Sequence, residues 1–343
     1  MSRFLVTGST GFLGRHLVKS LVDHGHTVVE FAFETGGNVL DRACVDRALA
    51  DGTFDGVFHC AGRVSRRPED AEMLHELHVT GTKNVLDACI AKGVKRVVVA
   101  STSGVVAVSD DPDHVATEDD EAPIGLINRW PYYRSKLFAE KAAFERHGQN
   151  DLEVVCVNPT ILFGPGDVNG SSTEDIRLFL ERKIPAIPPG GLSYVDARDA
   201  AEGMRLAMEK GVGGRRYLLG ACNMTFREFF ARLERVSGVR GPIVPMPRAP
   251  ELSRTGAGIL ERLAGRIGVP LPVDPVSLDM SNFYWYLDAS LAESELGWSP
   301  RDPTETLADT VKDLELRGIV WPETGSSLIS TLAKKVTRDG DRP

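Results

Sequence analysis

The feature that most constrains the fold is a glycine-rich turn near the start of the chain. The segment TGSTGFLG (residues 7–14) lies between a short apolar run at 4–6 and a helical pattern at 12–23. Gly8 and Gly11 permit a tight turn and a close backbone approach, and Gly14 lets the helix pack closely on the strand. The free N–H groups at a helix N-terminus bind phosphate. This order of strand, turn and helix predicts a site for the pyrophosphate of a dinucleotide.

Short apolar runs alternate with helical patterns through the first half of the chain. We expect strands at 4–6, 28–33, 56–60, 96–100 and 153–158, and helices at 12–23, 70–92 and 132–147. Strands that alternate with helices form right-handed βαβ units around a mostly parallel sheet. The sequence therefore predicts an α/β fold, with helices on both faces of a parallel sheet.

The alternation weakens after residue 159. Seven prolines fall between Pro242 and Pro275. Thr225 and Glu228 form a capping box that predicts a helix through Val236. This region is expected to be a smaller, mostly helical unit, although residues 216–219 could return a strand to the main sheet.

These patterns predict a division of the chain into two units and a tail. The first unit comprises residues 1–168, with 192–220 returning to it; the second comprises 169–191 and 221–320; the peripheral tail comprises 321–343. Within the tail, Leu328, Ile329 and Leu332 could dock one short helix.

Composition excludes several classes of protein. The 343 residues carry 40 Lys and Arg against 48 Asp and Glu, a net charge of −8, whereas nucleic acid and anionic membranes attract basic surfaces. No apolar run approaches the roughly 20 residues that span a bilayer. The five cysteines are too widely spaced for a disulfide framework or a zinc site. Because a strand and turn occupy the first ten residues, we expect no signal peptide, and hence a soluble, cytoplasmic protein without a metal.

Tyr132 and Lys136 form the first candidate catalytic pair. Their spacing of four places both side chains on one face of the predicted helix. A free phenol has a pKa of about 10, too high for acid–base catalysis near neutrality, and a nearby ammonium group lowers it. Such a pair is common on amphipathic helices. Downstream of the glycine-rich turn, however, it predicts catalysis by Tyr132.

Three consecutive hydroxyl side chains, Ser101, Thr102 and Ser103, follow the strand predicted at 96–100. They are expected at the carboxyl edge of the sheet, where ligands bind in open α/β folds. The alternative is that they only cap a loop.

Together these motifs resemble the extended short-chain dehydrogenase/reductase superfamily over most of the chain. The resemblance is carried by VFHCAG (57–62), GTKNVL (81–86), PYYRSK (131–136), NPTILFGPG (158–166) and YVDARD (194–199). YLLG (217–220) and LGWSPR (296–301) are most similar to dihydroflavonol-4-reductase-like and hydroxysteroid-dehydrogenase-like members.

The resemblance implies a Rossmann-type doubly wound sheet and an NAD(P)-dependent oxidoreductase that interconverts a ketone and a secondary alcohol. It implies that Tyr132 exchanges the proton of the substrate oxygen, while Lys136 lowers the Tyr132 pKa and holds the nicotinamide ribose. Ser103 aligns best with the hydroxyl that orients the substrate oxygen, and Ser101 and Thr102 are alternatives. Cofactor contacts are implied for Gly8, Thr10, Gly11, Phe12, Leu13, Gly14, Phe33, Asn38, Val39, Cys60, Ala61, Gly62, Thr102, Tyr132, Lys136, Pro159, Thr160 and Ile161.

The chain departs from the family pattern at three places. After the second strand, Glu34 would repel the 2′-phosphate of NADP and no Arg is present to bind it, which favours NAD. Asn38 replaces the family's adenine-binding Asp, and the short link from Phe33 predicts that the usual extra strand is missing or reduced. His78 stands where relatives often carry Asn, which argues against a proton relay through this position.

Other features have simpler interpretations. His75 and His78 are three residues apart, a spacing typical of an ordinary helical surface rather than of a zinc protease. A small basic cluster is more consistent with a solvated loop than with substrate binding; it comprises Arg63, Arg66 and Arg67. An aromatic cluster is more consistent with core packing than with a substrate pocket; it comprises Tyr284, Trp285 and Tyr286.

Two other functions remain open. A nucleotide-sugar epimerase or dehydratase with tightly bound NAD would need Arg215, Arg216, Arg248 or Arg254 to converge on a diphosphate. A non-catalytic cofactor-sensing protein on the same fold typically loses the Tyr-x-x-x-Lys pair, which this chain keeps. The expected partners are a small carbonyl or alcohol substrate and a second copy of the chain, paired through helices 70–92 and 132–147.

Overall fold

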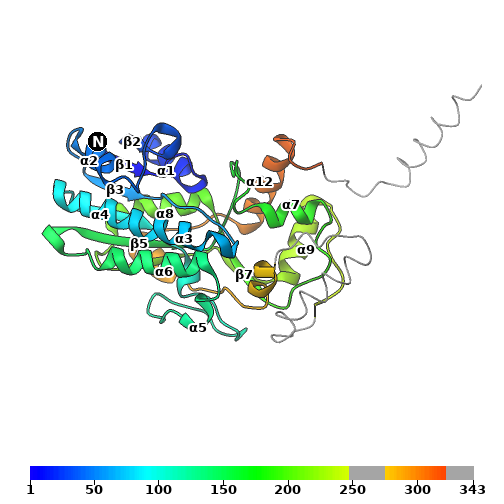
Figure 1. The fold of residues 1–343 in the computed structure, drawn as a ribbon. Helices are drawn as coiled ribbons and strands as arrows, with labels where there is room; N and C mark the ends of the chain where they lie inside the picture. The colour runs from blue at the N-terminus through cyan, green and yellow to red at the C-terminus, as the bar shows by residue number, and fades with distance from the viewer. Residues whose placement is uncertain (247–274, 322–343) are drawn as a thin grey trace, which may run out of the picture.

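A six-stranded parallel sheet forms the centre of the computed structural model, which describes residues 1–246 and 275–321 (Figure 1). Its strand order is β2-β1-β3-β4-β5-β8. The strands are β1 (Arg3–Thr7), β2 (Thr27–Phe31), β3 (Gly56–His59), β4 (Arg96–Ala100), β5 (Glu153–Pro159) and β8 (Arg216–Leu219). Every pair is parallel, so the predicted Rossmann-type α/β fold is confirmed.

Alternate residues of the strands face two hydrophobic cores. Phe4 and Val6 of β1 pack in one core with α1 (Phe12–Asp23) and α8 (Ala197–Lys210). Leu5 points to the other core, with α2 (Arg42–Ala50) and α4 (Gly81–Lys92). A strand covered by helices on both faces is apolar throughout, which explains the continuous apolar runs in the sequence.

The helix expected at 70–92 is confirmed. It begins with a 3₁₀ turn η2 (Pro68–Asp70) and continues without interruption through α3 (Ala71–His75), a π-turn η3 (Glu76–Thr80) and α4. Helix α2 was not predicted, although the Asp41 side chain caps it by accepting a hydrogen bond from the Cys44 amide at 3.2 Å. The link after β2 forms only a 3₁₀ turn, η1 (Phe33–Thr35), so the extra strand is absent there as expected.

Two further predictions hold closely. The helix expected at 132–147 is α6 (Pro131–Phe144), and the strand expected at 216–219 joins the main sheet as β8. Shorter helices and turns are η4 (Ser103–Val105), α5 (Ile124–Ile127), η5 (Gln149–Asp151), α11 (Pro275–Met280) and η6 (Ala292–Leu296).

A second, three-stranded sheet lies beside the first and was not predicted. It contains β6 (Ile161–Phe163), β7 (Gly191–Asp196) and β9 (Cys222–Thr225), with β7 in the middle. Helices α7 (Glu174–Leu180), α9 (Phe226–Ser237) and α12 (Pro303–Leu316) pack in the same hydrophobic core. The capping box at the start of α9 is confirmed. The proposed domain boundaries stay a prediction; within 192–220, β7 belongs to the second sheet and β8 to the first.

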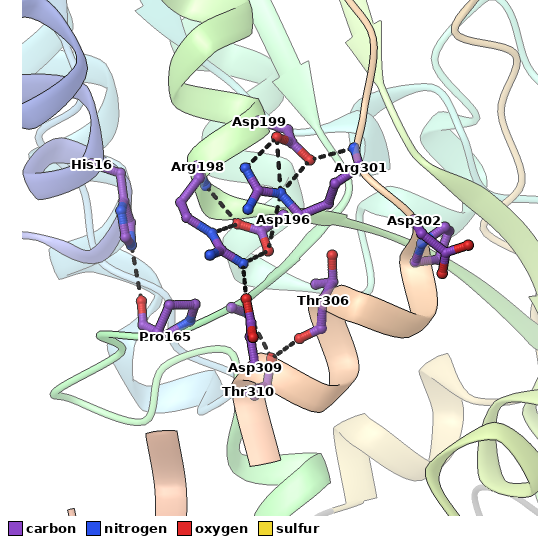
Figure 2. Close-up of polar contacts among 12 residues, drawn as sticks. His16, Pro165, Asp196, Arg198, Asp199, Arg301, Asp302, Thr306, Asp309 and Thr310 are labelled. Carbon is purple, nitrogen blue, oxygen red and sulfur yellow. Dashed lines mark hydrogen bonds and ion pairs between the residues drawn. The ribbon is translucent and has the colours of Figure 1, made fainter. Parts of the chain in front are cut away.

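Charged side chains fasten α12 to the start of α8 (Figure 2). Asp196 caps α8 by accepting a hydrogen bond from the Arg198 amide at 2.9 Å. The Arg198 guanidinium reaches Asp309 of α12 at 2.6 Å, and Arg301 pairs with Asp199 at 2.8 Å. The charges that flank Asp196, which is fully buried, offset the cost of its desolvation. These ion pairs join α8, which packs on the main sheet, to α12. The second sheet with its helices α7, α9 and α12 forms a second layer of the molecule, and the ion pairs hold this layer against the main sheet.

Among the helices that the structure describes, none combines the length and the apolar character needed to cross a bilayer. The predicted tail helix with Leu328, Ile329 and Leu332 lies outside the described residues.

Candidate active site

A cavity of about 850 Å³ opens at the carboxyl edge of the parallel sheet and extends under the second layer. Most of the predicted site residues line it: Gly8, Gly11, Phe12, Leu13, Gly14, Cys60, Gly62, Ser101, Thr102, Ser103, Tyr132, Lys136, Pro159, Thr160 and Ile161. Thr10, Phe33, Asn38, Val39 and Ala61 are not among the lining residues. The structure therefore brings together the predicted catalytic groups and the predicted phosphate-binding turn.

The glycine-rich turn has the geometry that a pyrophosphate needs. Gly8 has a φ of +67°, and a Cβ there would come within 2.7 Å of the Ala61 backbone. A Cβ on Gly14 would collide with the Gly8 carbonyl oxygen. Gly11 caps α1 without a side-chain hydrogen bond, so the first N–H groups of the helix keep their capacity for a ligand. These residues fit a dinucleotide.

The segment after β2 would face the adenosine end of such a cofactor. The Thr10 hydroxyl donates a 2.6 Å hydrogen bond to Glu34, and this bond is the main reason why the pKa of the Glu34 carboxyl lies below its usual value. Phe33 beside it is 81% exposed. Asn38 accepts a hydrogen bond from the Leu40 amide at 2.9 Å, so its carbonyl oxygen is already engaged in a turn. Val39 is buried in the core.

Lys136 and Tyr132 lie in the first turns of α6 and line the cavity. The Lys136 ammonium donates a 2.9 Å hydrogen bond to the carbonyl oxygen of Ala100, the last residue of β4. Burial lowers the Lys136 pKa to about 8. Burial also raises the Tyr132 pKa above its usual value, which outweighs the lowering effect of a hydrogen bond with Thr102. The expectation of a lowered Tyr132 pKa is therefore wrong for the chain by itself.

The three consecutive hydroxyls occupy different positions. Thr102 lies near enough to the Tyr132 phenol to act on its pKa, and its hydroxyl oxygen accepts a 3.4 Å hydrogen bond from the Gly104 amide. Ser103 is buried in the wall of the cavity, and the Ser101 hydroxyl is buried without a hydrogen-bond partner in the described structure. All three line the cavity with Tyr132, Thr102 is the one that acts on the Tyr132 pKa, and the assignment of Ser103 stays a prediction.

The prediction that His78 lies on a helical surface is wrong, because this residue is 1% exposed within the π-turn η3. Its Nε2 accepts a hydrogen bond from the Arg63 amide at 3.1 Å, so Nδ1 carries the proton and donates to Ser135 at 2.8 Å. Ser135 in turn donates to the Tyr132 carbonyl oxygen at 2.7 Å. Burial lowers the His78 pKa to about 2, so the ring is a neutral link between the loop after β3 and α6.

His59 is a second buried histidine, which the sequence analysis did not single out. Its ring nitrogens lie 2.8 Å from the Thr7 hydroxyl and 3.0 Å from the Thr82 hydroxyl. Burial lowers its pKa to about 3. This residue joins β1, β3 and α4 directly behind the glycine-rich turn.

Aromatic and apolar side chains line the part of the cavity that faces the second layer. Trp285 packs on Tyr133 with ring centroids 4.9 Å apart and on Trp130 at 5.3 Å. Phe226 and Phe230 of α9 line the cavity as well. Trp285 is 8% exposed, so it belongs both to the core, as predicted, and to the cavity wall.

Arg66 crosses from the cofactor side of the cavity to the second layer. Its guanidinium binds Asp175 of α7 at 3.0 Å and donates a hydrogen bond to Ser277 of α11 at 2.8 Å. The prediction of a solvated loop is therefore wrong for Arg66, while Arg67 is exposed as expected. Nothing in the local sequence links Arg66 to Asp175, because they are 109 residues apart.

The arginines that an epimerase would need are placed elsewhere. Arg215 pairs with Glu295 and Arg216 with Glu140, and neither lines the cavity. Arg248 and Arg254 lie outside the described residues. Among the residues described, there is no group of three His, Cys, Asp or Glu side chains that could hold a metal ion.

The parallel sheet, the glycine-rich turn and the cavity at its edge define a dinucleotide-binding protein of the Rossmann type. The model of the NAD dependent epimerase/dehydratase family matches residues 4–220. The chain belongs to this family, and is thus an enzyme that uses a nicotinamide cofactor.

Individual relatives cover nearly the whole chain. A dihydroflavonol 4-reductase-like protein of Synechocystis sp. is 32% identical over 336 residues, which cover 92% of this chain and 96% of that protein. The crystal structure of gox2253 has a TM-score of 0.79 at 25% identity, over 94% of this chain and 100% of its own. UDP-glucose 4-epimerase of Thermus thermophilus, solved in complex with NAD, has a TM-score of 0.70 at 23% identity, over 93% of this chain and 100% of its own.

Proposed function

We propose that the protein is an NAD(P)-dependent oxidoreductase that interconverts an apolar ketone and the corresponding secondary alcohol. The observation that carries this proposal is that Tyr132, Thr102 and Lys136 line one cavity whose other lining residues are largely aromatic and apolar. The Synechocystis relative is named as a reductase, which supports the same chemistry.

Tyr132 is the proposed general acid for reduction. Because burial raises its pKa, the phenol is protonated at neutral pH and can donate to a carbonyl oxygen. The Lys136 ammonium offsets the negative charge that the phenol oxygen acquires, and the Ala100 carbonyl holds that ammonium in place. Thr102, or the neighbouring Ser103, orients the substrate oxygen. The nicotinamide cofactor, when bound, supplies or accepts the hydride.

The charges of the cavity favour a neutral substrate over a nucleotide sugar. Its basic lining residues in the described structure are Arg63, Arg66 and Lys136. Arg66 is paired with Asp175, and Lys136 is assigned to Tyr132. A diphosphate needs several converging donors, and Arg215 and Arg216 are held by carboxylates outside the cavity. The epimerase alternative therefore has less support.

We propose NAD rather than NADP as the preferred cofactor. Glu34 lies after β2, at the position expected to face the adenosine ribose, and Thr10 holds its carboxylate there. A 2′-phosphate at this position would meet a negative charge.

We also propose that two copies of the chain pair through α3, α4 and α6. Phe138 on α6 is 44% exposed and packs edge-on against His75 of α3, so an apolar surface is present on these helices. Sedimentation of the wild type and of Phe138→Glu tests this: a dimer that becomes a monomer supports it, and a wild-type monomer contradicts it.

A substrate panel tests the proposed function. Ketones, secondary alcohols and nucleotide sugars are incubated with NADH or NAD, with cofactor turnover read at 340 nm and products by mass spectrometry. We expect stoichiometric cofactor oxidation with apolar ketones. Isomerised or dehydrated sugar without net cofactor turnover would overturn the reductase in favour of the epimerase or dehydratase.

A further inference from the structure

Helix α6 carries a third polar side chain on the face that bears Tyr132 and Lys136. Glu140 follows Lys136 by four residues, as Lys136 follows Tyr132, so the three side chains form one stripe along the helix. The Glu140 side chain is 1% exposed. Burying a carboxylate is costly unless charges and hydrogen bonds compensate. The proton transfer described above does not use this group.

Two partners on neighbouring strands hold the Glu140 carboxylate. Arg216 at the start of β8 pairs with Oε1 at 2.9 Å, and the Asn158 amide on β5 donates to Oε2 at 2.7 Å. The same amide nitrogen donates a second hydrogen bond, of 3.1 Å, to the Thr102 carbonyl oxygen. A continuous polar connection therefore runs from the edge strand β8 to Thr102, which lines the cavity with Tyr132.

The Glu140 carboxylate also acts on the pKa of Lys136, one turn earlier on α6. The titratable groups that interact with Lys136 come from β3 and the loop after it, the π-turn, β5 and α6: His59, Cys60, His78, Cys156 and Glu140. Burial keeps both imidazoles and both thiols uncharged at neutral pH. The Glu140 carboxylate is the charged member of this group, and it opposes the effect of burial on the Lys136 pKa.

We propose that Glu140 is a positioning residue of the reaction: its carboxylate keeps Lys136 in the ammonium form and, through Asn158, holds the Thr102 carbonyl in place. This inference rests on the proposed function, since it assigns Glu140 a task through Lys136 and Tyr132. Arg216 makes the arrangement possible, because its guanidinium offsets the desolvation of the carboxylate.

Two substitutions separate the charge from the hydrogen-bonded connection. Glu140→Gln removes the charge and keeps an oxygen that can accept from Asn158. Asn158→Leu removes the connection and keeps the charge. Glu140→Asp serves as the conservative variant. Glu145→Gln, exposed where α6 ends, is the matched control for replacing a carboxylate by an amide.

The primary readout does not depend on turnover. The reactivity of Lys136 toward a small acylating reagent is measured by mass spectrometry between pH 6 and 10, which yields its pKa in each protein. In Glu140→Gln we expect this pKa to fall by about one pH unit, because a nearby negative charge in a buried site is lost. It should stay at the wild-type value in Asn158→Leu, Glu140→Asp and Glu145→Gln.

The secondary readout is the pH profile of kcat for ketone reduction. In Glu140→Gln the alkaline limb moves to lower pH, because Lys136 loses its proton earlier. In Asn158→Leu kcat falls about tenfold across the whole range with little change in KM, as expected when a reacting group is misplaced. A purely structural role would leave the alkaline limb of Glu140→Gln where it is in the wild type.

An unchanged Lys136 pKa in folded Glu140→Gln would overturn the role of the charge, and an unchanged kcat in Asn158→Leu would overturn the role of the connection. If Glu140→Gln does not fold, Glu140→Met with Arg216→Met removes the ion pair as a whole, which buried sites usually tolerate. The Lys136 pKa must then fall in that double variant. A wild type that reduces no ketone, with a Lys136 pKa that still falls in Glu140→Gln, would refute the proposed function and leave the electrostatic role standing.

Discussion

The ammonium group of Lys136 donates its 2.9 Å hydrogen bond to the carbonyl oxygen of Ala100, the residue immediately before the three hydroxyl side chains. This contact fixes α6 relative to the end of β4. Because Tyr132 lies one turn before Lys136 on the same helix, it lines the same cavity as Lys136 and Thr102. The candidate site is thus assembled by a helix that docks on a strand end.

Tyr132→Phe should abolish ketone reduction and leave cofactor binding nearly intact. Removing a general acid typically lowers the rate by about 10²- to 10⁴-fold. Tyr286→Phe, which removes a hydroxyl outside the cavity, is the control. The kcat of both variants and the NADH affinity, by isothermal titration, are measured; a Tyr132→Phe enzyme with wild-type kcat would exclude Tyr132 as the acid.

NADH should bind more tightly than NADPH, and Glu34→Gln should reduce this preference several-fold. The substitution removes the negative charge that would face the 2′-phosphate while retaining a side chain that can bond Thr10. Isothermal titration of both cofactors gives the ratio of dissociation constants, with exposed Glu30→Gln on β2 as control. Tighter binding of NADPH by the wild type would contradict the role of Glu34.

Protein stability should decrease as the pH falls below about 6.5, because His59 and His78 are neutral in the fold and free to bind protons when unfolded. As the pH falls, each histidine lowers the free energy of unfolding by about 1.4 kcal/mol per pH unit, until the pH reaches its pKa in the folded state. His78→Asn should weaken this dependence, whereas His24→Asn, an exposed residue, should not.

Urea unfolding at pH 7.5 and pH 5.5 measures that difference. Between the two pH values, the free energy of unfolding of the wild type should fall by about 1.4 kcal/mol more than that of His78→Asn. Equal losses in the two proteins would show that His78 is not held neutral in the folded state.

The Arg66–Asp175 pair should contribute to substrate binding by holding the second layer over the cavity. Both side chains are partly exposed, so the contribution is about 1 kcal/mol, or about fivefold in KM. Arg66→Ala and Asp175→Ala should each raise KM with little change in kcat, while Arg67→Ala should not. Recovery of KM in the exchanged variant, Arg66→Asp with Asp175→Arg, distinguishes the ion pair from local packing; no recovery would argue against it.

The sequence predicted the parts of the molecule that depend on local patterns. Residues 12–23, bounded by Gly11 and followed by Gly25, form α1 as expected, because amphipathic spacing and helix-end signals act within one segment. The second sheet escaped prediction since β6, β7 and β9 are short and pair across distant segments. Likewise, Arg66 could not be linked to Asp175, nor Glu140 to Arg216, because tertiary structure alone brings them together.

The site residues could likewise be predicted only where local sequence determines their position. Tyr132 and Lys136 share a helix, so their common face followed from spacing. The choice among Ser101, Thr102 and Ser103 depends on how η4 turns after β4, which the sequence did not indicate. His78 lies in the π-turn η3, and its burial depends on the packing of this turn against the loop after β3 and α6, which the sequence did not indicate.

Transfer of a deuterium label from the cofactor to the product tests the proposed ketone reduction directly. NADH deuterated at the transferable C4 position is incubated with the best ketone of the panel, and the alcohol is analysed by mass spectrometry. We expect one deuterium on the carbinol carbon for each NADH oxidised, and none with Tyr132→Phe. Product that forms without label and without net NADH oxidation would exclude hydride transfer to a ketone.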